Sequence, residues 1–185
     1  MTQKPELLPY EPFKKGLVDV FTGDGKGKTT AALGVVLRAL GYGLKVHIVF
    51  FMKGGVSYGE ERVLSQFPGL TFARYGRPAF TDPRHVTEED KAEARAAFED
   101  ARKAVLSGEY NLVVLDEVNV AVGFGLLDVE EVLRLVEEKP GHVELILTGR
   151  RAHPRLIEVA DLVTEMVEVK HPFKKGVLAR AGIDY

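Results

Sequence analysis

Nine consecutive residues, from position 22 to position 30, have the composition and spacing of a loop that binds nucleotide phosphates. The stretch reads Thr22, Gly23, Asp24, Gly25, Lys26, Gly27, Lys28, Thr29 and Thr30. Glycines allow successive backbone N–H groups to turn toward anionic oxygens. Lys28 would neutralise phosphate charge, and the hydroxyl of Thr29 could ligate Mg²⁺. The standard motif starts with glycine where this chain has Thr22. A glycine-rich turn without a ligand is the alternative, but the pattern favours a nucleotide site.

The segments on both sides of this loop are of the types that a phosphate loop requires. Residues 17–21 alternate as a short buried strand, and residues 31–40 read as a helix. A helix that begins at the loop adds the partial positive charge of its N-terminus to the same point. We expect Lys28 to be exposed when no ligand is bound, so that its replacement removes activity without affecting folding.

A second candidate site begins where the apolar run 112–115 ends, at Asp116 and Glu117. A buried strand that ends on an acidic residue is the usual second half of a nucleotide and metal site. Mg²⁺ prefers oxygen ligands and keeps several waters, so one or two carboxylates plus phosphate oxygens suffice. We therefore predict Thr29, Asp116 and Glu117 as metal ligands. The alternative is that the acidic pair only caps the following segment.

Three further loops contribute weaker candidates. Lys53 and Glu60 follow a predicted strand at 45–51, and Arg150 follows another at 143–147. A guanidinium or ammonium group at these positions could reach phosphate or ribose, although solvated surface charges fit equally well. Phe80 lies in a proline-flanked loop and could cover a flat ligand. His153 precedes a proline and fits a capping role better than acid–base catalysis.

Strands alternate with helices along the whole chain. Strands are predicted at 17–21, 45–51, 70–74, 112–115, 143–147 and 162–169, and helices at 31–40, 61–67, 87–106, 128–137 and 154–160. This alternation predicts an α/β fold with a parallel sheet between two helical layers, of the P-loop NTPase-like (RecA-like) type. Ligands of such folds bind at the carboxyl ends of the strands. We expect a flexible proline-bearing arm at 1–16, a nucleotide-binding domain at 17–169 and a tail at 170–185 that packs near the site.

Composition narrows the class of protein further. The 185 residues are 45% hydrophobic and 28% charged, with a net charge of −2, so neither nucleic acid nor a membrane is expected as a partner. The chain has no cysteine, which excludes disulfides and thiolate chemistry. No apolar run approaches membrane-spanning length, and residues 1–15 are polar, without the apolar core expected of a signal peptide. We expect a cytoplasmic enzyme.

The residues alone leave the reaction open. A RecA-like ATPase or nucleotide switch would use Glu117 to activate water. A small-molecule kinase would transfer the γ-phosphoryl group and could use Arg74, Arg77 and Arg84. Adenosyl transfer and non-catalytic binding fit the same motifs.

Several separated segments together resemble one family. They are residues 22–32, the run 51–54 followed by Gly59 and Glu60, residues 113–119, the runs 147–150 and 160–166, and the ending 169–185. In this order and spacing they are similar to the corrinoid adenosyltransferases of the cobalamin pathway (the CobA/BtuR family), which also have threonine at the start of the loop. The resemblance covers residues 17–185.

The resemblance implies transfer of the 5′-deoxyadenosyl group of ATP to the Co(I) of a corrinoid, with release of inorganic triphosphate. It implies ATP and Mg²⁺ at the site, Lys28 and Glu117 as catalytic residues, and Glu117 as a metal partner rather than a base. It also implies a homodimer, with a flavoprotein reductase as candidate partner. An aromatic loop of the family displaces the lower axial ligand of cobalt. Here Phe80 is the candidate for that role, although the tryptophan typical of the loop is absent.

Overall fold

The predicted strands form one parallel sheet. The computed structural model describes residues 15–55, 58–79 and 81–184. The strands are β1 (Val18–Thr22), β2 (Val46–Phe50), β3 (Leu70–Arg74), β4 (Leu112–Asp116), β5 (Glu144–Thr148) and β6 (Leu162–Glu165). They pair in the order β3-β2-β4-β5-β1-β6, and every pair is parallel. Strand β5 therefore separates β1, which leads into the glycine-rich loop, from β4, which ends on Asp116.

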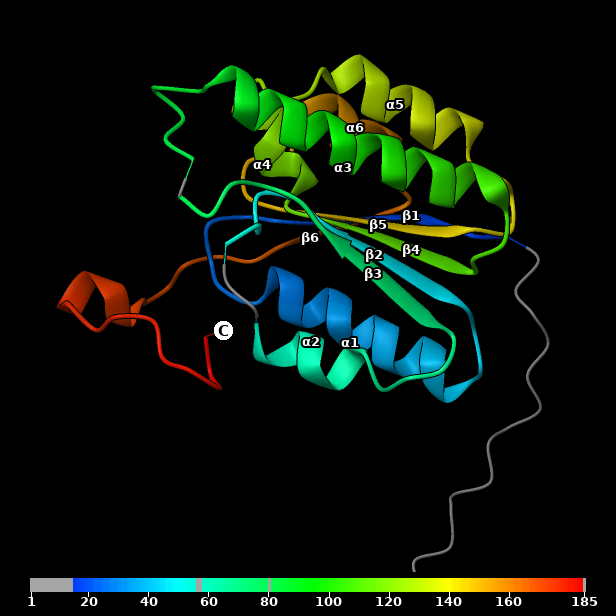
Figure 1. The fold of residues 1–185 in the computed structure, drawn as a ribbon, viewed down its shortest axis with the longest axis horizontal. Helices are drawn as coiled ribbons and strands as arrows, with labels where there is room; N and C mark the ends of the chain where they lie inside the picture. Colours follow the sequence, from blue (N-terminus) through cyan, green and yellow to red (C-terminus); the bar gives the residue numbers. More distant parts are fainter. Residues whose placement is uncertain (1–14, 56–57, 80, 185) are drawn as a thin grey trace, which may run out of the picture.

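Helices cover both faces of this sheet (Figure 1). Helices α1 (Lys28–Gly41) and α2 (Gly59–Leu64) lie on one face. The other face carries α3 (Glu88–Ser107), α4 (Val118–Gly123), α5 (Val129–Glu138) and α6 (Pro154–Val159). The predicted three-layer α/β fold of the P-loop NTPase-like type is thus confirmed. None of the described helices is long and apolar enough to cross a membrane.

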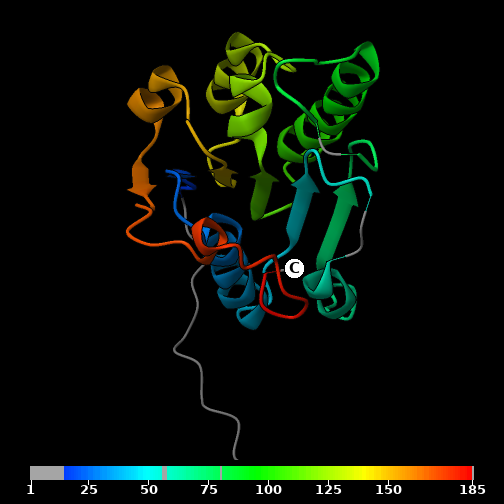
Figure 2. The same ribbon diagram turned by 90° about the vertical axis from the view of Figure 1, so that its left-hand side faces the viewer.

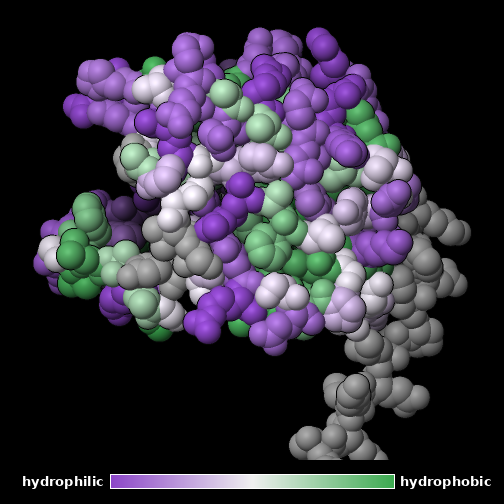
Figure 3. Space-filling model, viewed as in Figure 1, coloured by the Kyte–Doolittle hydropathy of each residue, from purple (hydrophilic) through white to green (hydrophobic). Residues whose placement is uncertain are grey.

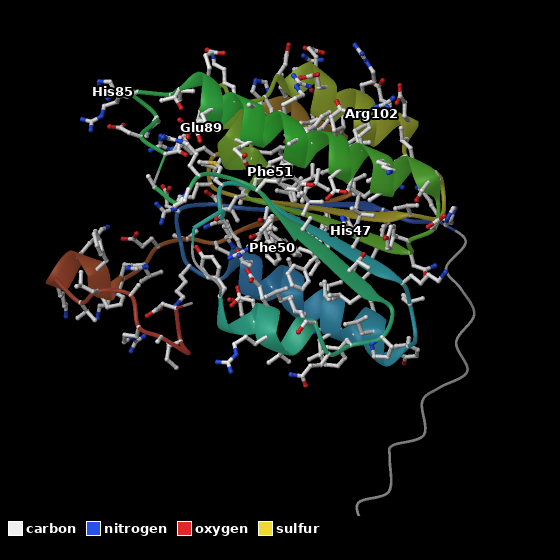
Figure 4. All side chains as sticks on the ribbon, viewed as in Figure 1. His47, Phe50, Phe51, His85, Glu89 and Arg102 are labelled. Atoms are coloured by element: carbon white, nitrogen blue, oxygen red, sulfur yellow. The ribbon has the colours of Figure 1, made fainter. Side chains whose placement is uncertain are left out.

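Each face of the sheet has its own hydrophobic core. Phe50 packs with Val36 of α1, whereas the next residue, Phe51, packs with Phe98 of α3. Figure 4 shows the two phenylalanines on opposite sides of the sheet. Successive side chains of a strand point to opposite faces, so one apolar run can serve both cores. This explains why all five residues of β2 and of β4 are buried.

Capping residues define the helix ends that the sequence predicts best. The Thr87 side chain accepts a hydrogen bond from the amide of Asp90, and the Asp90 side chain accepts one from the amide of Thr87, which completes a capping box. Gly108 ends α3 with φ 67°, a conformation that glycine adopts without strain. The side chain of Asp128 caps α5 in the same way as Thr87 caps α3.

Three features differ from the sequence prediction. Helix α4 was not expected, because its sequence is rich in β-branched valine; burial of Val118, Asn119 and Ala121 against β5 stabilises it. Strand β6 ends at Glu165 rather than 169, because its partner β1 ends at Thr22. A short 3₁₀ helix, η1 (Pro172–Lys175), interrupts the tail.

The tail beyond β6 returns to the edge of the sheet where the strands end. Figure 2 shows this red segment in front of α1. Lys26 of the glycine-rich loop donates a hydrogen bond to the carbonyl oxygen of Ile183 at 3.2 Å and forms an ion pair with Asp184. The predicted candidate loops therefore share one end of the sheet with the last residues of the chain.

Candidate functional site

The glycine-rich loop joins β1 to α1 as predicted. Gly27 precedes the first residue of α1 with φ 118°, and Gly23 has φ 92°. These angles lie in the left-handed region, which glycine occupies without the Cβ penalty of other residues. No side chain caps α1, so the first amides of the helix are available to an anion at this point.

The position of Lys28 contradicts the expectation that its side chain is exposed when no ligand is bound. Its side chain is not exposed: the residue retains only 7% of its accessible surface. The Nζ atom donates hydrogen bonds to the carbonyl oxygens of Gly23 at 2.8 Å and Gly25 at 2.6 Å. Burial lowers the pKa of Lys28, while Glu117 acts in the opposite direction. The loop therefore folds around its own lysine, because the backbone carbonyls satisfy the ammonium group.

Two of the glycines are required by the neighbouring strand end. A Cβ atom on Gly23 or Gly25 would lie 2.5 or 2.6 Å from the carbonyl oxygen of Met166, which is closer than real Cβ contacts. The amide of Gly25 also donates to that carbonyl at 2.6 Å. This amide is therefore committed to the segment after β6. The glycine pattern reflects close backbone packing as well as access to an anion.

Asp116 lies at the centre of a hydrogen-bonded cluster at the end of β4. Its Oδ1 accepts bonds from the hydroxyls of Thr29 at 2.9 Å and Thr148 at 2.6 Å, and its Oδ2 is 2.6 Å from Nζ of Lys53. The Asp116 side chain is 1% exposed. Thr29 of α1, Thr148 of β5 and Lys53 after β2 thus all contact the carboxylate at the end of β4. This agrees with the prediction that the loops at the strand ends converge.

Thr148 was not among the predicted site residues. It ends β5, the strand between β1 and β4, and its hydroxyl also accepts a hydrogen bond from the amide of Glu117 at 3.0 Å. Its type alone gave no signal. Only the strand order places it next to Asp116.

The charges of Lys53 and Glu117 are strongly influenced by burial and by each other. Burial disfavours the charge of Lys53, but Asp116 and then Glu117 outweigh it and raise the pKa of this lysine. Its Nζ also lies 5.0 Å from the ring centre of Tyr58. For Glu117, burial and the neighbouring Asp116 raise the pKa, and Lys53 only partly compensates. Glu117 is therefore a carboxyl that gains from a nearby cation.

A cavity of about 740 Å³ opens above these groups. It lies beside the tail, where Figure 3 shows a hollow in the surface. Of the predicted site residues, the cavity is lined by Gly25, Lys26, Gly27, Lys28, Thr29, Thr30, Lys53, Glu117 and Arg150. Its volume is within the range of small-molecule and cofactor sites. The structure thus brings most of the predicted residues to one space.

The other candidates lie elsewhere. Asp116 is beneath the cavity, bonded to Thr29 and Lys53. Glu60 is in the first turn of α2 and does not line the cavity. Asp24 lines a smaller cavity of about 370 Å³, which it shares with Arg150. Phe80 lies outside the described residues.

Thr22, Gly23 and His153, which the sequence analysis named, have partners within the fold. The hydroxyl of Thr22 accepts a bond from the amide of Ala152 at 3.0 Å, and Gly23 packs against Met166. His153 caps α6, since its Nδ1 is 3.3 Å from the Arg155 amide. The capping role predicted for His153 is confirmed.

Several side chains that line the cavity are apolar. Val120 and Phe124 come from α4 and its C-terminal end, Met52 follows β2, and Pro83 belongs to the loop after β3. The sequence analysis missed Val120 and Phe124 because it did not predict α4. The cavity lining therefore offers both charged groups and apolar side chains.

Thr29, Asp116 and Glu117 offer the oxygen donors that a hard divalent cation prefers. The Thr29 hydroxyl lies 2.9 Å from Asp116 Oδ1, and the ammonium group of Lys53 is the cation that contacts Oδ2 in this structure. Within the described ranges, no group of three or more His, Cys, Asp or Glu residues could hold a metal alone. A cation here would need oxygens from a bound ligand.

The fold is that of a P-loop NTPase-like α/β protein. It has a parallel sheet, a glycine-rich turn into α1, and a buried aspartate on β4, two strands away from β1. Comparison with known proteins narrows this class. Residues 14–185 match the family model described as ATP:corrinoid adenosyltransferase BtuR/CobO/CobP.

The curated relatives agree with that match. The chain is 40% identical over 172 residues to the corrinoid adenosyltransferase of Pseudomonas aeruginosa, covering 93% of this chain and 85% of the relative. It is 41% identical over 185 residues to that of Sinorhizobium sp, covering 98% and 86%. For Escherichia coli K12 the identity is 40% over 172 residues, covering 93% and 87%. The chain belongs to the ATP:corrinoid adenosyltransferase family, which confirms the resemblance found in the sequence.

Proposed function

We propose that this protein transfers the 5′-deoxyadenosyl group of ATP to the cobalt of a reduced corrinoid and releases inorganic triphosphate. One observation carries the proposal beyond family membership. A single cavity is lined by the glycine-rich loop and Arg150 and also by the apolar side chains of Val120, Phe124 and Pro83. This lining suits a triphosphate at the loop and the cations, and the flat, largely apolar face of a corrin ring at the apolar side chains.

The reaction requires no nucleophile from the protein. The Co(I) electron pair forms the bond to C5′ of the ribose, and the C5′–O5′ electron pair leaves with the triphosphate. The protein must then align the two substrates and stabilise charge that accumulates on the leaving group. Residues Lys26–Thr30 and Arg150 are suited to the second task, because they supply amides and cations to the cavity.

Lys28 and Glu117 are the proposed catalytic residues. For Lys28 to bind a phosphate, its Nζ must exchange the carbonyls of Gly23 and Gly25 for phosphate oxygens. This exchange is favourable because a phosphate carries a full negative charge. Glu117, whose pKa is raised by burial and by Asp116, gains more from a cation than from a neutral water.

We propose that Mg²⁺ completes this site, held by Thr29, Asp116 and Glu117 together with phosphate oxygens. When bound, it would neutralise the triphosphate as a leaving group. Lys53 would then turn from Asp116 toward the phosphates, since its Nζ already lies among the cavity-lining groups. Thr22, Gly23 and Asp24 would shape the loop, and Glu60 and Phe80 remain candidates for contacts with the second substrate.

The wider setting of the reaction is also a proposal. Reduction of Co(II) to Co(I) needs one electron from outside the chain, for which a reduced flavoprotein is the proposed donor. We propose a homodimer that works in the cytoplasm, where ATP is supplied, with residues 170–185 closing near the bound corrinoid. Of the arm expected at 1–16, residues 1–14 lie outside the described residues, and Gly16 is hydrogen-bonded to Gly141. The pair between Lys26 and Asp184 supports the role of the tail.

The test is an anaerobic assay of the purified protein with MgATP and chemically reduced cobalamin. The absorption spectrum of cob(I)alamin is followed, and the phosphate products are separated. The proposal predicts adenosylcobalamin together with intact triphosphate. ADP and phosphate with an unchanged corrinoid spectrum would instead indicate an ATPase or nucleotide switch.

A further inference from the structure

The loop between β3 and α3 is attached to the first turn of α3 by a single buried carboxylate. Asp90 is the third residue of α3, and its side chain is 1% exposed. Arg77 and Thr81 of the loop and Thr87 at the helix start all donate to it. We call these four residues the Asp90 clamp. Figure 4 marks the region with His85 in the loop and Glu89 in the first turn.

The clamp holds two points of the loop on the same atom. Oδ1 of Asp90 accepts from Nε of Arg77 at 2.8 Å and from the Thr81 hydroxyl at 3.0 Å. Oδ2 accepts from Nη2 of Arg77 at 3.0 Å and from the hydroxyl and amide of Thr87 at 2.6 and 2.9 Å. A two-pronged guanidinium–carboxylate pair fixes orientation as well as distance. The side chains of Arg77 and Thr81 therefore both donate to the same carboxylate oxygen, Oδ1 of Asp90.

Helix capping does not require this arrangement. The Thr87 hydroxyl accepts the Asp90 amide at 3.1 Å, which caps α3 without Arg77 or Thr81. A buried ion pair adds little stability compared with apolar side chains of the same size. The additional contacts of Asp90 therefore act on the position of the loop rather than on the helix.

The start of the same loop is fixed to the nucleotide side of the site. The Gly76 amide donates to Glu93 of α3 at 2.9 Å, and the Lys53 amide donates to the Tyr75 carbonyl at 2.8 Å. A Cβ on Gly54 would lie 1.5 Å from the Gly76 carbonyl oxygen, so the two backbones are in direct contact. Lys53 in turn reaches Asp116. The start of the loop is thus attached to α3 through Glu93 and, through Lys53, to the Asp116 cluster.

Thr81 and Pro83 of this loop line the cavity, and Thr81 is itself buried. We propose that Asp90 is a positioning residue, which holds Arg77 and Thr81, and with them Pro83, at the cavity so that the corrinoid is bound in the orientation needed for transfer. The inference rests on the proposed function. It goes further, because it assigns the positioning of the corrinoid to the Asp90 clamp. The clamp does not contact the nucleotide side of the site.

The experiment compares Asp90→Asn and Thr81→Val with the wild-type protein and with Glu131→Gln. Asparagine turns one acceptor of position 90 into a donor, and valine removes one hydroxyl at nearly constant volume. Glu131 is the matched control, because it forms a similar two-pronged pair with Arg95 of α3, at 2.8 Å for one prong, away from the loop.

Three quantities are measured for each variant: the KM for pre-reduced cob(I)alamin, the KM for ATP, and hydrogen exchange over residues 75–87. We expect the KM for cob(I)alamin to rise roughly tenfold in Asp90→Asn, the size of change that follows loss of one charge-assisted hydrogen bond. The KM for ATP should stay within about twofold, since the phosphate loop is untouched. Exchange should increase in residues 75–87 and not elsewhere, and Glu131→Gln should change none of the three.

A spectroscopic measurement separates positioning from simple loss of structure. The electron paramagnetic resonance spectrum of cob(II)alamin bound with MgATP reports whether the lower axial ligand is on cobalt. The fraction without that ligand should fall in both clamp variants. If Asp90→Asn does not fold, Thr81→Val decides the matter, because it leaves the helix cap intact.

Two results would overturn the inference: equal changes in both KM values, or clamp variants that behave as Glu131→Gln does. Failure of the proposed function looks different, because the wild-type protein would then make no adenosylcobalamin. That result would overturn both.

Discussion

Replacement of Lys53 by methionine tests the charge balance of the Asp116 cluster. Lys53 Nζ lies 2.6 Å from Asp116 Oδ2, and the two side chains are 13% and 1% exposed. Methionine keeps the length and apolar stem of the side chain and removes only its charge. Asp116 would retain the hydroxyls of Thr29 and Thr148 but lose its counterion.

The expected loss of stability follows from that geometry. Removing one partner of a buried ion pair costs about 3–5 kcal/mol, and the two remaining hydroxyl donors place this case near the lower end, at about 3 kcal/mol. For a chain of this length, 1 kcal/mol shifts Tm by about 2–4 °C, so Tm should fall by about 6–12 °C. The pKa of Lys53 is raised in the folded state. Its contribution is therefore complete below the ordinary lysine pKa and lost only as pH rises through the raised value, so pH 7 is a suitable condition.

The assay is thermal unfolding followed by circular dichroism, without nucleotide or metal. A double-mutant cycle with Asp116→Asn isolates the pair, since the second substitution should cost much less once the first is made. Glu130→Gln is the control, because its pair with Arg155 is about half exposed and should change stability by less than about 1 kcal/mol. A fall in Tm no larger than that of the control, or additive effects in the cycle, would refute the assigned role of the pair.

Three other predictions concern activity. Lys28→Ala should reduce turnover at least about a hundredfold, as expected for loss of a group that stabilises the leaving charge, and retained activity would contradict the phosphate site. Phe80→Ala should slow reaction with cob(II)alamin under a mild reductant more than with pre-reduced cob(I)alamin, whereas equal effects would remove its proposed role. Glu117→Gln should lose activity yet raise Tm without ligands: burial and Asp116 raise the pKa of Glu117, so its ionisation destabilises the fold as pH rises above the ordinary glutamate pKa. An unchanged or lower Tm at pH 7 would oppose this reasoning.

Local chemistry made most of the fold predictable. The capping box of Thr87 and the left-handed Gly108 set the ends of α3 through contacts within a few residues, which sequence patterns record directly. Helix α4 shows the limit of such patterns. Its N-cap is Glu117, a non-glycine residue with φ 67°, and the helix contains three valines in six residues. Its existence depends on packing against β5, which no local pattern contains.

The site residues divide in the same way, into those that local patterns indicate and those that depend on long-range contacts. The glycine-rich loop, Lys53, Glu117 and Arg150, which line the cavity, were found because loops at the carboxyl ends of parallel strands must converge. Thr148 and Asp90 were missed because their roles come from partners 32 and 13 residues away, at Asp116 and Arg77. The burial of Lys28 was misjudged for a related reason. Its partners are carbonyls, and a sequence does not indicate which way a carbonyl points.

The threonine at the start of the glycine-rich loop has a structural reason that the motif alone conceals. Thr22 is the last residue of β1 and pairs with Glu165, so the strand continues through the position where the standard motif has glycine. Its hydroxyl accepts the amide of Ala152, which is buried with 9% of its surface accessible. A glycine at position 22 would leave that buried amide without its partner, at a cost of about 1–3 kcal/mol.

The same hydrogen bond fixes the turn that carries Arg150 into the cavity. Arg151, between Arg150 and the bonded amide of Ala152, has φ 55°, a conformation that non-glycine residues hold only when the surroundings enforce it. The bond to Thr22 is one such constraint, because it ties the end of the turn to β1. The departure from the standard phosphate loop is therefore connected to the placement of a cavity cation. In this chain the side chain at the first position of the motif holds the turn that carries Arg150.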